Sequence, residues 1–369
     1  MDVRTGELFA FKNEEEKRKE MDKRGEFLKA VMDEHEPEAR KILDGKKHGQ
    51  ADMNKSTPLV MRVGLVDVDG HRFPNYALMK ISAYHKQRGD SVEWWIGGFA
   101  YDRVYMSKVF TFTPDENTPI YSDDVIRGGT GYRAHDELPQ EIDDMEPDYT
   151  LYPNAWVTVN KKRVPYALGF LTRGCIRSCE WCIVPQKEGH IRPYRTWEQI
   201  RRPDAKAMVL MDNNVLACDH GIEQIGRMGG RSVYVDFNQG LDARLITPEI
   251  ARMLARVKWI RFVRMSCDTT AMLAVIERAA AYLKEAGIPT WRLYAYMLVR
   301  DIAEAERVIY GLDKLGITPF AQPYRDYKNT PPTDEQKGFA HWANKKSCFK
   351  SCQFKDFRYA GREALKKGE

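Results

Sequence analysis

The sequence predicts an α/β protein in which a small, mainly parallel sheet precedes a barrel or partial barrel of the TIM type. Two observations predict this class. From residue 58 onward, short apolar strands alternate with helices of apolar periodicity. From about residue 161, this alternation restarts and runs through six consecutive β/α units. With 369 residues, the chain is long enough for two domains with sizeable cores.

The chain divides into four segments that differ in composition and in the pattern of apolar residues. Residues 1–57 are highly charged and indicate a solvated helical extension, with helices around 14–32 and 38–43. Residues 58–160 follow a β-α-β-β order, with strands in LVMRVGLVDVDG, SVEWWIGG, RVYMSKVFTFT and DDVIRGGTGY and a helix that begins near Pro74. Residues 161–325 form the predicted partial barrel, and residues 326–369 are an aromatic and basic tail expected to cap it.

In the predicted barrel, strands and helices follow one another in strict order. The expected strands are 166–172, 207–211, 232–236, 259–265, 291–298 and 317–321, and the expected helices are 196–200, 221–228, 248–256, 270–286 and 302–315. In such barrels, function lies at the carboxyl ends of the strands. Cys175, Asp212, Asp236 and Asp268 each follow a predicted strand, which indicates a shared rim.

Composition and charge limit the expected location and partners of the protein. No apolar run approaches the roughly 20 residues needed to cross a bilayer, so no membrane partner is expected. The first residues lack the apolar core of a signal peptide, which predicts a cytoplasmic protein. The net charge of +5 is too small to indicate nucleic-acid binding by itself.

Three of the seven cysteines lie within eight positions, in the segment GCIRSCEWCIVP. In a reducing cytoplasm, clustered cysteines favour metal binding over disulfide bonds. Cys175, Cys179 and Cys182 offer three thiolates in a short loop after the first barrel strand. Since a [4Fe–4S] cluster takes four ligands, three from the protein leave one iron open to another molecule.

The segment GCIRSCEWC resembles the cluster loop of the radical S-adenosylmethionine (SAM) superfamily, including an aromatic residue, Trp181, before the last cysteine. The resemblance covers residues 160–325. It implies a partial (β/α)6 barrel with a [4Fe–4S] cluster on Cys175, Cys179 and Cys182. It also implies that the open iron holds SAM through its amino and carboxylate groups. SAM is then cleaved reductively to a 5′-deoxyadenosyl radical, with an electron donor of the flavodoxin or ferredoxin type.

Further SAM contacts match the superfamily by position rather than by letter. The segment MDNN follows the second strand, where many members hold the methionine amino group, and VRMSCD follows the fourth strand, where the ribose or the carboxylate is bound. For each polar residue, a strand-end turn or a helix cap is the alternative. The expected SAM contacts are Trp181, Asp212, Asn213, Asn214, Arg264, Ser266 and Asp268.

Two polar stretches are expected at the mouth of the barrel. VDFNQGLDARL follows the third strand, and the basic VPQKEGHIRPYR follows the cysteines. They suit a polar substrate or one that carries phosphate or carboxylate, although a turn and a solvated loop explain them as well. The expected substrate contacts are Lys187, His190, Asp236, Asn238, Gln239 and Arg244.

Residues 58–155 resemble the Rossmann-like, cobalamin-binding domain that precedes many radical SAM barrels. The resemblance depends on Asp69-x-His71 after the first strand, where such domains place a cobalt-ligating histidine, and on VIRGGTGY. Pro74 stands where that motif has a glycine. The domain is therefore expected to keep the fold without cobalamin and to serve as a lid or substrate platform.

The expected function is that of a radical SAM enzyme that abstracts hydrogen, with rearrangement of a modified nucleobase or nucleotide as the favoured reaction. Two enzymatic alternatives are a cobalamin-dependent methylase and a methylthiotransferase, the second with another cluster on Cys348 and Cys352 and two distant cysteines. A further alternative is a non-catalytic nucleic-acid-binding protein. It would be stabilised by a cluster, or by a zinc ion with His190 as the fourth ligand.

Overall fold

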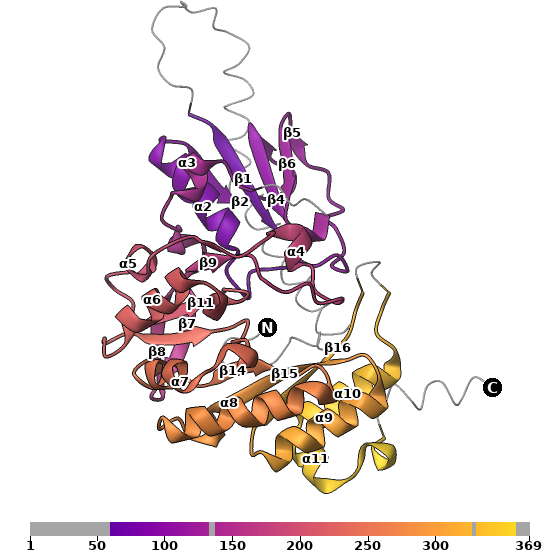
Figure 1. Ribbon diagram of the computed structural model, residues 1–369. Coiled ribbons are helices and arrows are strands. Elements are labelled where there is room, and N and C mark those ends of the chain that lie inside the picture. Colours follow the sequence, from indigo (N-terminus) through magenta and orange to yellow (C-terminus); the bar gives the residue numbers. More distant parts are fainter. Residues whose placement is uncertain (1–59, 133–136, 327–329, 359–369) are drawn as a thin grey trace, which may run out of the picture. The chain divides into compact units, whose positions relative to one another are not determined.

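The computed structural model describes residues 60–132, 137–326 and 330–358, and the chain from Met61 onward forms one compact unit (Figure 1). The helices expected around 14–32 and 38–43 lie outside the described residues. The domain boundaries expected at residues 160 and 325 stay predictions. Within the described ranges, every helix is too short or too polar to cross a bilayer.

The first sheet has four strands, all parallel, in the order β2-β1-β4-β6. The helix predicted near Pro74 begins after Asn75, whose side chain accepts a hydrogen bond from the Leu78 amide at 3.3 Å. It ends before Gly89, whose φ of 87° favours glycine. The elements are β1 (Arg62–Asp67), α2 (Tyr76–Gln87), β2 (Ser91–Trp94), β4 (Arg103–Ser107) and β6 (Val125–Gly128), with the short pair β3 (Ala100–Tyr101) and β5 (Tyr121–Ser122) beside them.

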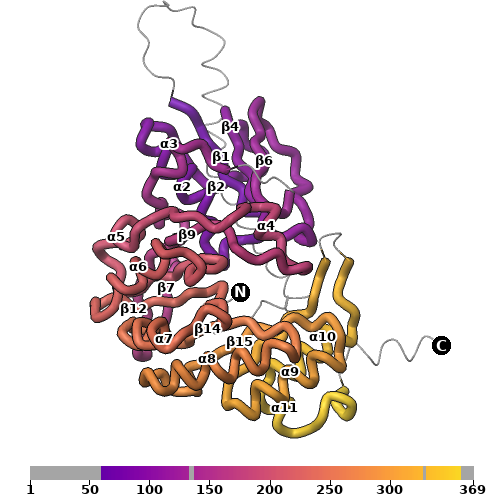
Figure 2. Tube along the Cα trace, in the orientation of Figure 1, coloured from indigo at the N-terminus to yellow at the C-terminus, as the bar shows by residue number. Residues whose placement is uncertain are grey.

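Six parallel strands then follow in chain order and form a curled half-barrel sheet, which Figure 2 traces along the chain. Its two hydrogen-bonded parts meet where Leu241 bridges Met265, and the Leu241 amide donates to the Arg264 carbonyl at 2.7 Å. The strands are β8 (Lys162–Gly169), β11 (Ala207–Leu210), β12 (Tyr234–Phe237), β14 (Val263–Ser266), β15 (Leu293–Val299) and β16 (Thr318–Pro323).

Further short elements flank these strands. β7 (Trp156–Val159) pairs antiparallel with β8, β13 (Lys258–Trp259) pairs with β12, and β9 (Thr172–Arg173) pairs antiparallel with β10 (Arg192–Pro193). The helices are α3 (Gln140–Asp143), α4 (Val184–Lys187), α5 (Trp197–Ile200), α6 (Asp219–Met228), α7 (Pro248–Ala255), α8 (Leu273–Glu285) and α9 (Ile302–Lys314). Single 3-10 turns occupy Thr130–Tyr132, Tyr149–Leu151, Val215–Ala217, Ala243–Leu245, Thr270–Met272, Thr290–Arg292 and Phe354–Asp356.

The predicted alternation of strands and helices is confirmed, with two corrections. The strand expected at 166–172 ends at Gly169, because the chain turns there and resumes as β9 against β10. The strand expected at 259–265 is split, because the chain leaves β12 after Trp259 and joins β15 from Val263.

The described part of the tail is folded against the half-barrel. α10 (Asp334–Asn344) packs on β16, where the Asn344 amide both donates to and accepts from the Ala321 backbone at 2.8 Å. Phe339 and Trp342 of α10 are fully buried in the core of the half-barrel. α11 (Lys346–Ser351) follows and carries Cys348.

Candidate metal centre

The three clustered cysteines lie on the loop between β9 and β10, beyond the carboxyl end of β8. Gly174 opens this loop with a φ of 82°, and a Cβ there would lie 2.3 Å from the His190 carbonyl oxygen. Only glycine tolerates this approach. The Cys175 amide donates to the Gly189 carbonyl at 3.2 Å, so the two ends of the loop are joined at its base.

Glu188 ties the base of the loop together. Its carboxylate accepts hydrogen bonds from the Arg173 guanidinium at 3.0 and 2.9 Å, from the Gly174 amide at 3.0 Å and from Asn213 at 2.9 Å. The Glu188 side chain is buried. Sequence reasoning missed this residue, because nothing in its neighbourhood distinguishes it from a solvated glutamate. Asn213, an expected SAM contact, is thus a partner of Glu188.

Asp212 holds the start of the same loop. Its buried carboxylate accepts from the Leu171 amide at 3.0 Å and from the Thr172 amide and hydroxyl at 2.6 and 2.7 Å. Burial raises the pKa of Asp212 to about 6, although these hydrogen bonds favour the charged form. Asp212 therefore positions the turn between β8 and β9.

The three cysteines influence one another electrostatically. Burial raises the pKa of Cys182, and the charges of Cys179 and Cys175 raise it further. All three cysteines are half-buried, and the Arg177 amide donates to Sγ of Cys175 at 3.3 Å. In the described part of the chain, no three Cys, His, Asp or Glu side chains are already arranged as a metal site. Three thiols on one loop are nevertheless a donor set that suits iron or zinc.

Asn214 lies against the first cysteine and is almost fully buried, with 3% exposed. Its amide nitrogen lies 3.5 Å from Sγ of Cys175 and 3.3 Å from Oδ2 of Asp242. Its Oδ1 atom is buried and has no hydrogen-bond partner among the described residues. Since an unsatisfied buried acceptor costs about 1–3 kcal/mol, this atom indicates a donor that the described residues do not supply.

Positive charge surrounds the thiols. Asp242 accepts from Nε of Arg177 at 3.0 Å and from Nε of Arg244 at 2.7 Å. Burial opposes ionisation of Asp242, but the hydrogen bonds from both arginines hold its pKa below the usual value. The hydrogen bond to Asp242 raises the pKa of Arg244, and the Cys179 and Cys175 thiols raise it further. Two guanidinium groups therefore lie where their positive charge can offset that of thiolates.

Trp181 and Asp268, both predicted for SAM, are brought together. The Asp268 carboxylate accepts from the Leu298 amide at 3.0 Å, and the neighbouring Trp181 side chain favours its charged form. Burial raises the pKa of Asp268. Arg300, which sequence reasoning missed, lies 4.6 Å from the centre of the Trp181 ring. Its position directly after β15 was the one available signal.

Arg264 and Asp236 pair with each other. Two hydrogen bonds, of 2.8 and 3.0 Å, join the guanidinium to the carboxylate, and both side chains are buried. Nη1 of Arg264 donates to the Tyr296 hydroxyl at 3.0 Å, and that hydroxyl donates to the Asn238 carbonyl at 2.9 Å. The pair therefore fixes the loop after β12, which carries Asp242 and Arg244.

The other expected residues are more exposed or lie at loop ends. Ser266 ends β14 and is half-buried. Gln239 is exposed and donates to Asn238 at 3.1 Å. His190 is exposed, with Nδ1 3.3 Å from the Ile191 carbonyl, and burial lowers the pKa of Lys187 on α4.

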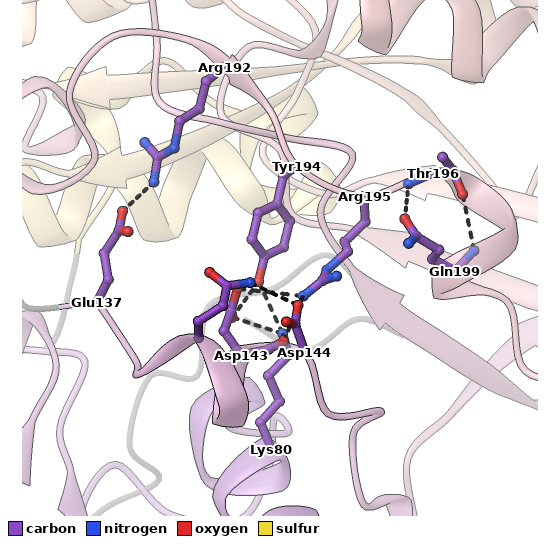
Figure 3. Close-up of polar contacts among 10 residues, drawn as sticks. Lys80, Glu137, Asp143, Asp144, Arg192, Tyr194, Arg195, Thr196 and Gln199 are labelled. Atoms are coloured by element: carbon purple, nitrogen blue, oxygen red, sulfur yellow. Dashed lines mark hydrogen bonds and ion pairs between the residues drawn. The ribbon is translucent and has the colours of Figure 1, made fainter.

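A polar network ties the return of the cysteine loop to α2 (Figure 3). Nζ of the buried Lys80 donates to Oδ1 of Asp143 at 2.9 Å and to the Tyr194 hydroxyl at 3.0 Å. Arg195 donates to the Asp143 carbonyl at 2.8 Å and to Asp144 at 2.7 Å. Since the Tyr194 amide bonds the Leu171 carbonyl at 2.9 Å, this network holds both flanks of the loop.

The Asp69-x-His71 motif makes contacts within the first sheet's own loops. Asp69 accepts from the Phe110 amide at 3.4 Å and from the Thr113 hydroxyl at 2.5 Å. The His71 ring packs edge-on against Trp94, with centroids 4.1 Å apart. The hydrogen bonds of Asp69 brace the loop after β4, and the His71 ring packs on the end of β2.

The site as a whole combines three thiols, an unpartnered buried acceptor and a rim of arginines. No family model matches the chain, and no curated protein is detectably similar to it. The chemistry of the site is therefore inferred from its own residues.

Proposed function

We propose that this protein is a radical SAM enzyme, with a [4Fe–4S] cluster held by Cys175, Cys179 and Cys182. The observation that carries the proposal is the buried Oδ1 of Asn214, which has no partner among the described residues, on an amide that lies 3.5 Å from Sγ of Cys175, the first of three cysteines on one loop. Three thiolates supply three of the four ligands of such a cluster. An acceptor next to them suits the ammonium group of SAM.

When bound, the cluster and SAM would supply the radical chemistry that removes a hydrogen atom from a substrate. Asn214 would accept a hydrogen bond from the ammonium group through Oδ1. Arg177 and Arg244, already beside the thiols through Asp242, would offset the charge of the thiolates. Trp181, which neighbours Asp268 and has the Arg300 guanidinium over its ring, would form one side of the same site.

The order and direction of the strands also support this assignment. Six parallel strands in chain order fit a partial (β/α)6 barrel, and the four-stranded parallel sheet fits a Rossmann-like domain. We assign no cobalamin to the Rossmann-like domain, since Asp69 and His71 serve its own loops. The enzyme would act in the cytoplasm with an electron donor of the flavodoxin or ferredoxin type.

The test is anaerobic reconstitution with iron and sulfide, followed by SAM and a chemical reductant. We expect a brown protein with about four irons per chain, which forms 5′-deoxyadenosine from SAM. Cys179→Ser should lose both properties. Cys218→Ser, which alters a half-buried cysteine at the start of α6, is the matched control and should keep both.

The double variant Cys348→Ser, Cys352→Ser tests whether the protein holds one cluster or two. We expect it to retain the iron content of the wild type, because Cys352 follows one helical turn after Cys348 and both pack against the core beside α10. A wild-type protein that binds a single zinc ion and does not cleave SAM would refute the proposal in favour of a zinc-stabilised binding protein.

A further inference from the structure

The loop after β4 exposes two aromatic rings side by side. Phe110 is 42% exposed and Phe112 is 44% exposed. The ring centroids lie 5.2 Å apart with an angle of 25° between the planes, so the rings are stacked. Neighbouring exposed apolar side chains of this kind mark binding surfaces more often than chance.

This loop is braced rather than loose. Asp69 accepts from the Phe110 amide and the Thr113 hydroxyl on one side. On the other side, the Gly131 amide donates to the Lys108 carbonyl at 2.8 Å. A Cβ at Gly131 would lie 2.4 Å from Cγ of Lys108, so the close approach needs a glycine. The protein therefore holds the two rings in their exposed position.

The position of the loop is that of a ligand site. It follows β4 at the carboxyl edge of a parallel sheet whose order is β2-β1-β4-β6. β2 lies on one side of β1 and β4 lies on the other, so the order of the strands reverses between β1 and β4. Open α/β sheets bind ligands at the carboxyl edge beside such a switch point. Arg325, which follows β16, places its guanidinium carbon 4.4 Å from the centre of the Phe112 ring. The loop thus contacts the carboxyl end of the half-barrel, where the cysteine loop also lies.

The chemistry of the surface selects its ligand. Nucleobases stack on aromatic rings and guanidinium planes, and arginines pair with phosphates. Arg325 lies over Phe112, and the exposed Arg127 of β6 acts electrostatically on Tyr132, next to the same loop. A duplex keeps its base faces covered, whereas a single strand offers them.

We propose that Phe110 and Phe112 form a stacking platform for the bases of a single-stranded nucleic acid. As a statement about the substrate of the metal centre, this inference rests on the proposed function. The binding itself is measured without any turnover.

The experiment measures fluorescence anisotropy of a labelled single strand of about 12 nucleotides on the reconstituted full-length protein. Phe110→Ala and Phe112→Ala should each raise Kd by about 5- to 150-fold, the range that stacking of one base covers. Phe112→Tyr should restore binding, because it keeps a ring. Phe112→Leu should not, because it keeps only an apolar side chain.

Trp291→Ala is the matched control. Trp291 is 61% exposed and has the Arg292 guanidinium 4.8 Å from its ring, but it precedes β15, at the opposite end of that strand from the metal centre. Its Kd should equal that of the wild type. Because Phe110 and Phe112 are exposed, their variants should also keep the wild-type Tm.

The inference would be overturned if the wild type did not bind, or if Phe112→Ala bound as well as the wild type. Wild-type binding by Phe112→Leu would overturn it too and would indicate an apolar protein partner. Competition by a free nucleoside monophosphate as strong as by the unlabelled strand would also overturn it. Failure of the proposed function is a separate outcome, since a wild type that does not cleave SAM would still bind the strand.

Discussion

The amide nitrogen of Asn214 lies 3.5 Å from Sγ of Cys175, while Oδ1 of the same amide is buried without a partner in the described chain. The second contact of that nitrogen, with Asp242 at 3.3 Å, fixes the orientation of the amide. The side chain is therefore held by its donor end, and its acceptor end is left for another molecule.

Replacing Asn214 should separate SAM binding from cluster binding. In Asn214→Ala, we expect the Kd for SAM to rise about 10- to 150-fold, because a hydrogen bond to a charged group contributes about 1.5–3 kcal/mol. The iron content should stay at the wild-type level. Equilibrium dialysis and iron analysis measure both. Asn213→Ala, whose amide bonds Glu188 instead, should bind SAM more tightly than Asn214→Ala, and the reverse order would contradict the assignment.

Gly174→Ala should prevent the cysteine loop from closing. The new Cβ would lie 2.3 Å from the His190 carbonyl oxygen, and the φ of 82° is strained for alanine. We expect loss of most of the iron after reconstitution. Gly189→Ala is the control, because its φ is 69° but its Cβ would meet nothing within 4 Å. It should lose only about 1 kcal/mol of stability and keep its iron. Equal iron in the two variants would show that the close approach is unimportant.

Lys80→Met should loosen the contact between α2 and the cysteine loop. Removing the ammonium takes away the buried hydrogen bonds to Oδ1 of Asp143 and to the Tyr194 hydroxyl, although Tyr194 still donates to Asp143 and Arg195 still pairs with its carboxylate. We expect a loss of about 2 kcal/mol in the free energy of urea unfolding. Lys86→Met, on the same helix, removes a more exposed ion pair with Asp148 and should cost at most about 1 kcal/mol. Similar losses in both variants would argue against a special role for Lys80.

Asp67 should make stability depend on pH. Burial raises its pKa to about 7, although the Tyr152 hydroxyl donates to it at 2.7 Å. The unfolded chain loses this proton near pH 4, so the contribution of Asp67 to stability is greatest below that pH and falls as pH rises to about 7. Asp67→Asn should therefore be more stable than the wild type at pH 8, by about 2–4 kcal/mol, since each pKa unit is worth about 1.4 kcal/mol.

Urea unfolding of both proteins between pH 4 and pH 8 checks this sign. The advantage of Asp67→Asn should shrink steadily toward pH 4. A difference that does not change with pH would mean that Asp67 keeps its ordinary ionisation in the folded protein.

Local signals in the sequence located most elements of the half-barrel. The helix expected at 248–256 is found at Pro248–Ala255, because Thr247 caps it and Pro248 suits its first turn. The strand expected at 207–211 is found at Ala207–Leu210, as a short buried apolar run. The split of the strand expected at 259–265 had no local signal, since it depends on which neighbour each half meets.

The candidate site was predicted in part. The three cysteines and Trp181 lie on one short loop, so their spacing alone groups them. Asp212 was expected to contact SAM, and Asp236 was expected to contact the substrate. In the structure, Asp212 instead accepts a hydrogen bond from Thr172, and Asp236 accepts hydrogen bonds from Arg264.

By itself, the sequence determined the order of strands and helices and the cluster of thiols, because both depend on residues close together along the chain. Only the tertiary structure decided the partner of each buried charge. Arg264 and Asp236 are 28 residues apart, Thr172 and Asp212 are 40 apart, and Lys80 and Asp143 are 63 apart. A buried charge must find a partner, but packing selects which of several distant candidates arrives within hydrogen-bond distance.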